Sequence, residues 1–394
     1  MKTYPLKRLS LEQATELQFR LVDAIHREFD GREIVQDGDH GHSLRPDLGR
    51  PLYTAKVEAV LEAFFDLPRV ALVRGGGTSA LRSIIMSALR PAGSVLVHDA
   101  PLYPTTRETF AAMGALVGTA DFNDTDALAA AMRAQPELLH VQHARHLLAD
   151  RYDLADVLST ARSVSPATFV MVDDSYAVCR APAIGAQLGA DVSGFSFFKL
   201  LGPSVGCVAA GSPRGVALID RIRQLNKSGG QRVPGPEAME ILRGLVLAPV
   251  ALAVQGGVVE QVAARLQARE CAGVQGAWAA NCNSYAVFVE LEEPIAAQVL
   301  DIAQTLGAQR QVVGSESRLE MAALIHEPFH YFAGTGDVGA VIGSDRWLRV
   351  NPHRAGPDTI IRILSEAIAA VRDRSGPGTA GRSSMKPSQR EETA

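Results

Sequence analysis

A single lysine of this sequence lies in strongly apolar surroundings, where its chemistry changes. Lys199 follows a predicted buried strand over residues 192–196. Its immediate neighbours are Phe198 and Leu200. Burial removes water from the ammonium group and therefore lowers the pKa of the amine. A neutral amine is the nucleophile that Schiff-base formation with a carbonyl compound requires. A lysine with a purely structural role is the alternative interpretation.

A glycine-rich turn lies between a predicted strand over 70–73 and a predicted helix over 78–89. The turn reads, in order, Gly75, Gly76, Gly77, Thr78 and Ser79. Glycines let the backbone approach an anion closely, and the N–H groups at the start of a helix bind phosphate. The two hydroxyl groups add further donors. The turn therefore predicts a phosphate site, whereas a tight turn that only requires positive φ is the structural alternative.

The type of phosphate compound is a separate question. No lysine follows the glycines, so the sequence does not fit a nucleotide P-loop. Gly75, Gly77 and Ala80 do satisfy the dinucleotide fingerprint. Asp99 ends the next predicted strand, as a ribose-binding carboxylate does. A nicotinamide-dependent dehydrogenase is therefore one hypothesis.

A carboxylate at the end of another predicted strand, over 168–172, favours a different cofactor. Asp173 follows that strand, and open α/β sheets bind ligands at the carboxyl ends of their strands. A phosphate site, a carboxylate and a buried lysine are the parts that pyridoxal 5′-phosphate (PLP) needs. Asp173 would keep the pyridinium nitrogen protonated, and Lys199 would hold the aldehyde. Hydride transfer needs neither residue, so the sequence predicts PLP as the cofactor.

The order and spacing of these residues resemble the fold-type I PLP enzymes, the aspartate aminotransferase superfamily, over about residues 50 to 370. Asp173 and Tyr176 resemble the D-x-x-Y motif, which implies that Tyr176 reaches the 3′-oxygen of the cofactor. Ser196 resembles a family serine that also holds the phosphate. The resemblance implies cofactor contacts from Gly76, Gly77, Thr78, Ser79, Tyr103, Asp173, Tyr176, Ser196 and Lys199.

Different segments resemble different branches of this superfamily. Tyr103 resembles the aromatic residue that stacks on the cofactor in the cysteine/methionine-metabolism branch, which makes it a catalytic candidate beside Lys199 and Asp173. The run after Lys199 resembles class V aminotransferases and the selenocysteine-synthase branch. Residues 142–145 resemble a segment of cystathionine-lyase-like proteins. Over its whole length, the chain is most similar to class V aminotransferase-like proteins.

Arginines and a histidine are the candidates for substrate binding. A bidentate arginine is the residue type that best holds the carboxylate of an amino acid. Arg349 resembles the carboxylate-binding arginine of the small domain in this superfamily and is the first candidate. Arg145 and Arg354 are alternatives, and His143 is a further candidate near the cofactor. A surface arginine and a structural histidine are the non-functional interpretations.

The predicted reaction acts on a small amino acid through a carbanion at its Cα. Lys199 would serve as the general base at Cα. Protonation on the cofactor gives transamination, whereas loss of a β or γ leaving group gives a lyase. The sequence narrowly favours an aminotransferase, with an elimination lyase as the alternative. A PLP-binding protein without catalysis is a further hypothesis.

Short apolar strands alternate with helices from residue 70 to residue 172, which predicts a mainly parallel sheet covered on both faces. Two closely spaced strands over 192–196 and 205–210 favour an antiparallel pair, so the sheet is expected to be mixed. The predicted fold is α/β: a PLP-transferase-like, three-layer large domain and a small α+β C-terminal domain. The predicted units are an N-terminal helix and arm (1–49), the large domain (50–267), the small domain (268–373) and a disordered tail (374–394).

Composition excludes several classes of function. The net charge of −4 shows no basic surplus, which argues against a nucleic-acid partner. No apolar run reaches the length of a membrane helix. The four cysteines form no CxxC motif, so no metal site is predicted and a reducing cytoplasm is expected. The superfamily resemblance implies a homodimer or a dimer of dimers.

Overall fold

The computed structural model describes most of the chain between residues 8 and 375. The predicted substrate residues Arg145 and Arg354, and nearly all of the predicted tail, lie outside the described residues. The described ranges are 8–35, 44–45, 48–100, 102–144, 151–200, 202–229, 232–279, 286–310, 331–333, 345–352 and 355–375.

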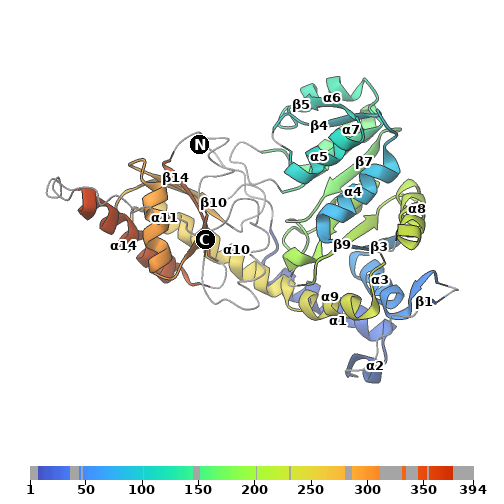
Figure 1. The fold of residues 1–394 in the computed structure, drawn as a ribbon, viewed down its shortest axis with the longest axis horizontal. Coiled ribbons are helices and arrows are strands. Elements are labelled where there is room, and N and C mark those ends of the chain that lie inside the picture. The colour runs from blue at the N-terminus through green and yellow to red at the C-terminus, as the bar shows by residue number, and fades with distance from the viewer. Residues whose placement is uncertain are drawn as a thin grey trace, which may run out of the picture.

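A seven-stranded sheet, here called the larger sheet, forms the centre of the fold (Figure 1). Its spatial order is β3, β9, β8, β7, β6, β4 and β5. β9 runs antiparallel to both of its neighbours, and all other neighbouring pairs are parallel. The mainly parallel, mixed sheet that the sequence predicts is therefore confirmed. The strands are β3 (Arg69–Arg74), β4 (Ser94–His98), β5 (Leu116–Ala120), β6 (Leu138–Gln142), β7 (Phe169–Asp173), β8 (Val192–Ser196) and β9 (Val205–Ala210).

Side chains that alternate along the strands enter separate hydrophobic cores on the two faces of the larger sheet. In β3, Val70 and Leu72 belong to one core, and Ala71 and Val73 belong to the other. Helices cover both cores, so the predicted three-layer arrangement is confirmed. The first face is covered by α1 (Leu11–Glu28), α3 (Leu52–Phe65), α6 (Thr125–Met132), α7 (Leu154–Val164) and α9 (Gly235–Leu245). The second face is covered by α4 (Gly76–Ala88), α5 (Pro104–Ala112) and α8 (Pro213–Gly229).

The N-terminal region departs from the sequence prediction in its second half. α1 begins with a capping box, because Ser10 and Gln13 each accept a hydrogen bond from the backbone N–H of the other. The composition of residues 31–51, which are rich in Gly, Asp, His and Pro, predicts an irregular loop. This segment contains the short helix α2 (Gly31–Val35) and the paired strands β1 (Leu44–Arg45) and β2 (Arg50–Pro51). The Asp30 carboxylate accepts two backbone N–H groups at the start of α2, which accounts for that helix.

The sequence predicts one helical stretch over residues 236–267, and the structure divides it into α9 and α10 (Ala248–Gln267), which meet at a bend of 45°. Pro249 lies in the first turn of α10. Proline has no N–H to donate to the preceding turn, so the helix cannot continue unbroken through it. Figure 1 shows α10 running from the larger sheet to the other end of the molecule. No single helix among the described residues could span a membrane; only α9 and α10 taken together meet the length and apolarity required.

A five-stranded sheet, here called the smaller sheet, follows α10. Its core contains side chains from α10, α11 (Ala296–Thr305) and α14 (Pro357–Ser375). The sequence did not predict β10, whose register shifts at Gly276 and so lacks simple alternation. β12 and β13 were also missed because they are very short. The strands, in spatial order, are β10 (Val274–Ala279), β11 (Val287–Leu291), β14 (Trp347–Asn351), β13 (Tyr331–Ala333) and β12 (Gln309–Arg310). The domain boundaries stay a prediction.

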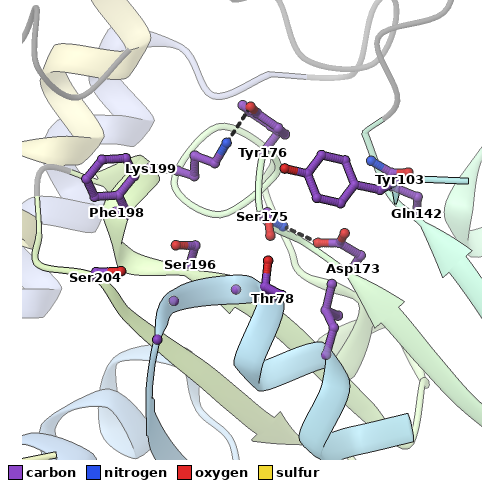
Figure 2. Close-up of a pocket in the computed structure, with 14 residues that line it drawn as sticks. Thr78, Tyr103, Gln142, Asp173, Ser175, Tyr176, Ser196, Phe198, Lys199 and Ser204 are labelled. Atoms are coloured by element: carbon purple, nitrogen blue, oxygen red, sulfur yellow. Dashed lines mark hydrogen bonds between the residues drawn. The ribbon is translucent and has the colours of Figure 1, made fainter. Parts of the chain in front are cut away.

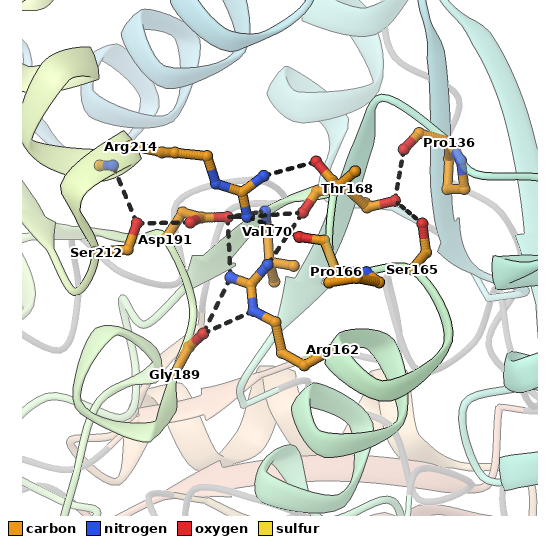
Figure 3. A network of polar contacts seen from close by, with 12 residues as sticks. Pro136, Arg162, Ser165, Pro166, Thr168, Val170, Gly189, Asp191, Ser212 and Arg214 are labelled. Carbon is orange, nitrogen blue, oxygen red and sulfur yellow. Dashed lines mark hydrogen bonds and ion pairs between the residues drawn. The ribbon is translucent and has the colours of Figure 1, made fainter.

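A buried carboxylate links β7 to β8 at the amino end of β8 (Figure 3). Asp191 directly precedes β8 and has no exposed surface. One of its oxygens accepts hydrogen bonds from the backbone N–H of Val170 at 2.8 Å and from Arg162 and Arg214 at 2.9 and 3.1 Å. The other oxygen accepts from the hydroxyl of Ser212 at 2.6 Å. These hydrogen bonds hold β7 and β8 together at one end. At the other end, β7 finishes at Asp173 and β8 leads into the segment that contains Lys199.

Replacement of Asp191 by asparagine is expected to lower the free energy of unfolding by about 3 kcal/mol. The NH₂ group of the asparagine would face N–H and O–H groups that are themselves hydrogen-bond donors. The guanidinium groups of Arg162 and Arg214 would also lose the negative charge that compensates them. Urea unfolding followed by circular dichroism measures the change. Asp358→Asn is the control, since it removes an exposed ion pair with Arg265 and should leave the unfolding curve nearly unchanged. Equal curves for both variants would contradict a structural role for Asp191.

Candidate active site

A cavity of about 170 Å³ lies at the carboxyl ends of the central strands (Figure 2). Three segments that are distant in the sequence meet there. The glycine-rich turn joins β3 to α4, Asp173 ends β7, and Lys199 lies in the 3-10 helix η2 (Phe197–Leu200), directly after β8. The cavity is lined by Gly75, Gly76, Gly77, Thr78, Leu81, Tyr103, Gln142, Asp173, Ser175, Tyr176, Ser196, Phe198, Lys199 and Ser204.

The glycine-rich turn has the backbone that a phosphate site needs. Gly76 has φ of 72°, in the left-handed region that favours glycine. Gly77 is closely packed: a Cβ on it would lie 3.0 Å from the Cβ of Ser196 and 3.2 Å from Oγ of Ser175. The first N–H groups of α4 and the hydroxyls of Thr78 and Ser196 therefore border one small space. Backbone donors at a helix start, with hydroxyls around them, fit a phosphate.

The amine of Lys199 is buried against Tyr176. Nζ of Lys199 donates to the hydroxyl of Tyr176 at 2.5 Å and lies 4.0 Å from the centre of its ring. Burial lowers the pKa of Lys199 well below its ordinary value of 10.5. Asp173 partly opposes this effect, whereas the positive charges of Arg180 and Arg349 add to it. An amine with a lowered pKa is available in its neutral, nucleophilic form.

The carboxylate of Asp173 lies within the same buried region. Burial raises the pKa of Asp173, and hydrogen bonds from Ser175 and the charge of Lys199 limit the rise. The backbone N–H of Ser175 donates to Oδ1 of Asp173 at 3.0 Å (Figure 2). A buried carboxylate with few fixed donors can accept a further proton-bearing group. A protonated ring nitrogen is a group of that kind.

Tyr103 and Gln142 complete the side of the cavity opposite η2. Tyr103 precedes α5, and its side chain keeps 41% of its surface exposed. Figure 2 shows its ring directed into the cavity, with the hydroxyl toward Tyr176. Gln142 ends β6, beside Asp173 at the end of β7. Of the predicted cofactor residues, only Ser79 does not line the cavity.

The predicted substrate residues lie in different places. Arg349 lies on β14 of the smaller sheet, is 4% exposed, and influences the amine of Lys199 electrostatically. His143 does not line the cavity. Its Nδ1 is 2.6 Å from Oδ1 of Asp174, whose other oxygen accepts the backbone N–H of Gly185 at 3.0 Å. This buried pair holds the loop after β7, which is a positioning arrangement rather than a substrate contact.

Several residues at the site were not predicted from the sequence. Ser175 and Ser204 line the cavity beside the predicted residues, and the sequence indicates Gln142 only as part of a segment that resembles cystathionine-lyase-like proteins. Arg180 does not line the cavity but lowers the pKa of Lys199, and no motif of the sequence indicates it. It follows Tyr176 by four residues, in a turn whose shape no hydrophobic pattern indicates. Only its short distance in the chain from Asp173 and Tyr176 could have pointed to it.

Among the described residues, one group of histidine and carboxylate side chains has the spacing that a metal ion would need. His98, Asp99 and Asp121 bring possible ligand atoms within 4.8 Å of one another. The backbone N–H groups of Asp99 and Phe122 approach Nδ1 of His98 at 3.0 and 3.2 Å, so this nitrogen already has donors around it. The group therefore makes a weak cation site.

The donor set of the cavity fits PLP. A phosphate cradle, a buried carboxylate and a buried lysine amine surround one space, and hydride transfer on a dinucleotide would need neither the carboxylate nor the amine. The three-layer fold is that of a fold-type I PLP-dependent enzyme, and the residues of this site fit that class. The comparisons with known proteins agree. Residues 54–270 match the family described as "Cys/Met metabolism PLP-dependent enzyme", and residues 260–364 match "YhfS-like, C-terminal domain".

The chain belongs to the Cys/Met metabolism family of PLP-dependent enzymes. It is 43% identical to the uncharacterized protein YhfS of Escherichia coli (strain K12), over 94% of this chain and 100% of that protein. A crystal structure described as the PLP-dependent protein YhfS from E. coli superposes with a TM-score of 0.85 at 42% identity, again over 94% and 100% of the two chains. This membership replaces the dinucleotide interpretation of the glycine-rich turn.

Two further solved structures share the fold at low sequence identity. The cystathione gamma lyase CalE6 from Micromonospora echinospora has a TM-score of 0.69 at 19% identity, over 90% of this chain and 99% of that chain. A cystathionine gamma synthase from Xanthomonas oryzae pv. oryzae, in complex with aminoacrylate and cysteine, has a TM-score of 0.69 at 18% identity, over 91% and 98%.

Gly77→Ala is expected to weaken PLP binding about tenfold, because overpacking a tight site costs about 1–3 kcal/mol. The added methyl group would press on Ser196 and Ser175 at the phosphate cradle. Titration of the apoprotein with PLP, followed by visible absorbance, measures the dissociation constant. Gly257→Ala is the matched control, because a Cβ there meets nothing within 4 Å. Equal affinities for the two variants would show that the phosphate is bound elsewhere.

Lys199→Met is expected to abolish the visible absorption band of the lysine-bound cofactor and to stabilise the apoprotein. The pKa of Lys199 is lower in the folded than in the unfolded chain, so the unfolded state binds the extra proton. The wild type therefore gains stability as pH rises from the folded pKa toward 10.5. The difference in melting temperature between variant and wild type should shrink over that interval. A variant that is less stable than wild type at neutral pH would contradict this account.

Proposed function

We propose that this protein is a PLP-dependent lyase that eliminates a β or γ substituent from a small amino acid. The observation that carries the proposal is the match of residues 54–270 to the Cys/Met metabolism family, since this range contains Tyr103, Asp173 and Lys199. The sequence alone narrowly favoured an aminotransferase. Family membership moves the balance toward elimination, and the names of the lyase and synthase that share the fold agree with that direction.

The chain's own residues supply the acid–base chemistry that elimination requires. When bound, PLP provides an electron sink for negative charge at the substrate Cα. Asp173 would hold the proton on the ring nitrogen of the bound cofactor. Lys199 would accept the proton from the substrate Cα, a role to which an amine with a lowered pKa is suited. The breaking of the bond to the leaving group then needs a proton at that group.

Tyr103 is the proposed donor of that proton. Its hydroxyl points into the cavity (Figure 2), and its exposed position lets a departing group leave without crossing the core. Arg349 is proposed to hold the substrate carboxylate, because a guanidinium group binds a carboxylate in bidentate fashion. Tyr176 is proposed to orient Lys199 through the hydrogen bond between them.

Transamination remains the second candidate, since it uses the same lysine and the same electron sink. The two reactions differ after the Cα proton has been removed. In transamination Lys199 would pass that proton to the cofactor, whereas in elimination the bond to the leaving group would break. Transamination also requires an added 2-oxo acid as amino acceptor. This requirement separates the two reactions experimentally.

We also propose that the protein acts as a homodimer or dimer of dimers in the cytoplasm. The buried thiols of Cys179, Cys207 and Cys271 support a reducing compartment. Burial raises the pKa of Cys179 to about 12, so its thiol is inert.

Incubation of the holoenzyme with amino acids that carry a leaving group at Cβ or Cγ is expected to release the 2-oxo acid, ammonia and the leaving group in equal amounts. Arg349→Gln should lower kcat/KM about 100-fold, because a buried charge pair loses one partner. Coupled assays for the 2-oxo acid and for ammonia measure both results. Arg133→Met, which removes an exposed arginine, is the control. Turnover that occurs only with an added 2-oxo acid, and without ammonia, would establish transamination instead.

A further inference from the structure

Two aspartates stand next to each other at the carboxyl end of β7, and both are buried. Asp173 is 6% exposed and lines the cavity, whereas Asp174 has no exposed surface and does not line it. A second carboxylate is therefore buried one residue away from the carboxylate that is proposed to meet the cofactor. A buried charge is stable only where partners compensate for its lost hydration. The partners of Asp174 accordingly decide what surrounds Asp173.

His143 is the side chain that compensates Asp174. Its Nδ1 lies 2.6 Å from Oδ1 of Asp174, and the backbone N–H of Gly185 donates to Oδ2 at 3.0 Å. Because an ionised carboxylate only accepts hydrogen bonds, Nδ1 of His143 carries the proton between them. His143 is itself only 6% exposed. A hydrogen bond to a charged group is stronger than one between neutral groups, so this contact fixes the side chain of Asp174.

The backbone of His143 is bonded to Asp173 as well. Its N–H donates to the carbonyl of Asp173 at 3.0 Å, and the N–H of Asp174 donates to the carbonyl of Gly194 on β8 at 2.9 Å. These two bonds satisfy both polar groups of the peptide unit that joins the aspartates. His143 directly follows β6, so this peptide unit is held from β6 on one side and from β8 on the other.

The direction of the Asp173 carboxylate depends on the peptide unit that follows Asp174. The N–H of Ser175 belongs to that unit and donates to Oδ1 of Asp173 at 3.0 Å (Figure 2). Without the bond from His143 to Asp174, this unit is free to turn and to withdraw its donor from Asp173. Burial and, to a smaller extent, the charge of Asp174 raise the pKa of Asp173. A charge on Asp174 that no histidine compensates would raise it further.

We propose that His143 is a positioning residue: by holding Asp174, it keeps Asp173 ionised and directed at the ring nitrogen of the cofactor. His143 does not line the cavity, so it acts only through the two aspartates. The inference rests on PLP as the cofactor and on the proposed contact of Asp173 with the ring nitrogen. It is independent of the reaction, because elimination and transamination use the same electron sink.

The test compares PLP with 1-deaza-PLP, in which a C–H group replaces the ring nitrogen. Both compounds carry the same phosphate and the same aldehyde, so the ratio of their dissociation constants reports only the contact at the ring nitrogen. Calorimetric titration of the apoprotein measures both constants. Wild type should bind PLP about 10- to 100-fold more tightly than 1-deaza-PLP, as a hydrogen bond between charged groups provides. Asp173→Ala should abolish this preference.

Substitution of His143 then tests its role. His143→Leu is expected to lower the ratio about tenfold, because the charged hydrogen bond that fixes Asp174 is lost. His143→Asn should keep most of the ratio, since the asparagine amide donates to Asp174 from the place of Nδ1. His140→Leu is the matched control, because His140 is a buried histidine of β6 whose ring packs against Phe110. A substitution that only loosens the fold weakens the binding of both compounds and leaves their ratio unchanged.

Circular dichroism establishes that each variant is folded. If His143→Leu does not fold, Asp174→Asn decides by the same ratio, because its NH₂ group would face the donor of either His143 or Gly185. An unchanged ratio in the folded variant would overturn the inference. A wild-type ratio in Asp173→Ala would overturn it too, by removing the contact on which it rests. Neither result bears on the choice between elimination and transamination, which the assays for ammonia and the 2-oxo acid decide.

Discussion

A lysine amine buried at the carboxyl edge of a sheet is stable only where the groups around it compensate for its lost hydration. In this protein the hydroxyl and ring of Tyr176 and the carboxylate of Asp173 provide that compensation, and two buried arginines work against it. The balance leaves the amine with a lowered pKa. The fold therefore accepts a stability cost at Lys199 that its cofactor chemistry requires, as enzymes commonly do at their active sites.

The two ends of β8 show how differently the same fold treats buried charge. At the amino end, Asp191 is surrounded by two guanidinium groups, a hydroxyl and a backbone N–H, so its charge is fully compensated and holds β7 and β8 in register. At the carboxyl end, Lys199 and Asp173 have few fixed partners. A polar network in which every group has a hydrogen-bond partner is rigid. The Asp191 network therefore supports the neighbouring site, where the groups remain available for ligands.

The smaller sheet contributes to the site through α10. The bend before Pro249 directs α10 away from the larger sheet, and the hydrogen bond between Gln255 and Asn351 ties it to β14. Arg349 of the smaller sheet thereby comes close enough to lower the pKa of Lys199, which directly follows a strand of the larger sheet. Because the proposed substrate-binding residue Arg349 and the proposed cofactor-binding residues come from different parts of the fold, small changes in the position of α10 would alter their relative placement.

The sequence by itself determined the features that depend on neighbours in the chain. Strand–helix alternation specified the larger sheet, and Lys199 was identified because its own flanking residues are apolar; the glycine-rich turn and Asp173 stood out because each directly follows a predicted strand. Only the tertiary structure decided which distant residues meet them. The position of Arg180 depends on the left-handed backbone at Cys179 and on the hydrogen bond from the N–H of Leu9 to the Arg180 carbonyl, and the pairing of His143 with Asp174 depends on the parallel register of β6 and β7. Local patterns report propensity and periodicity, whereas contacts between segments arise from packing, which no short stretch of sequence encodes.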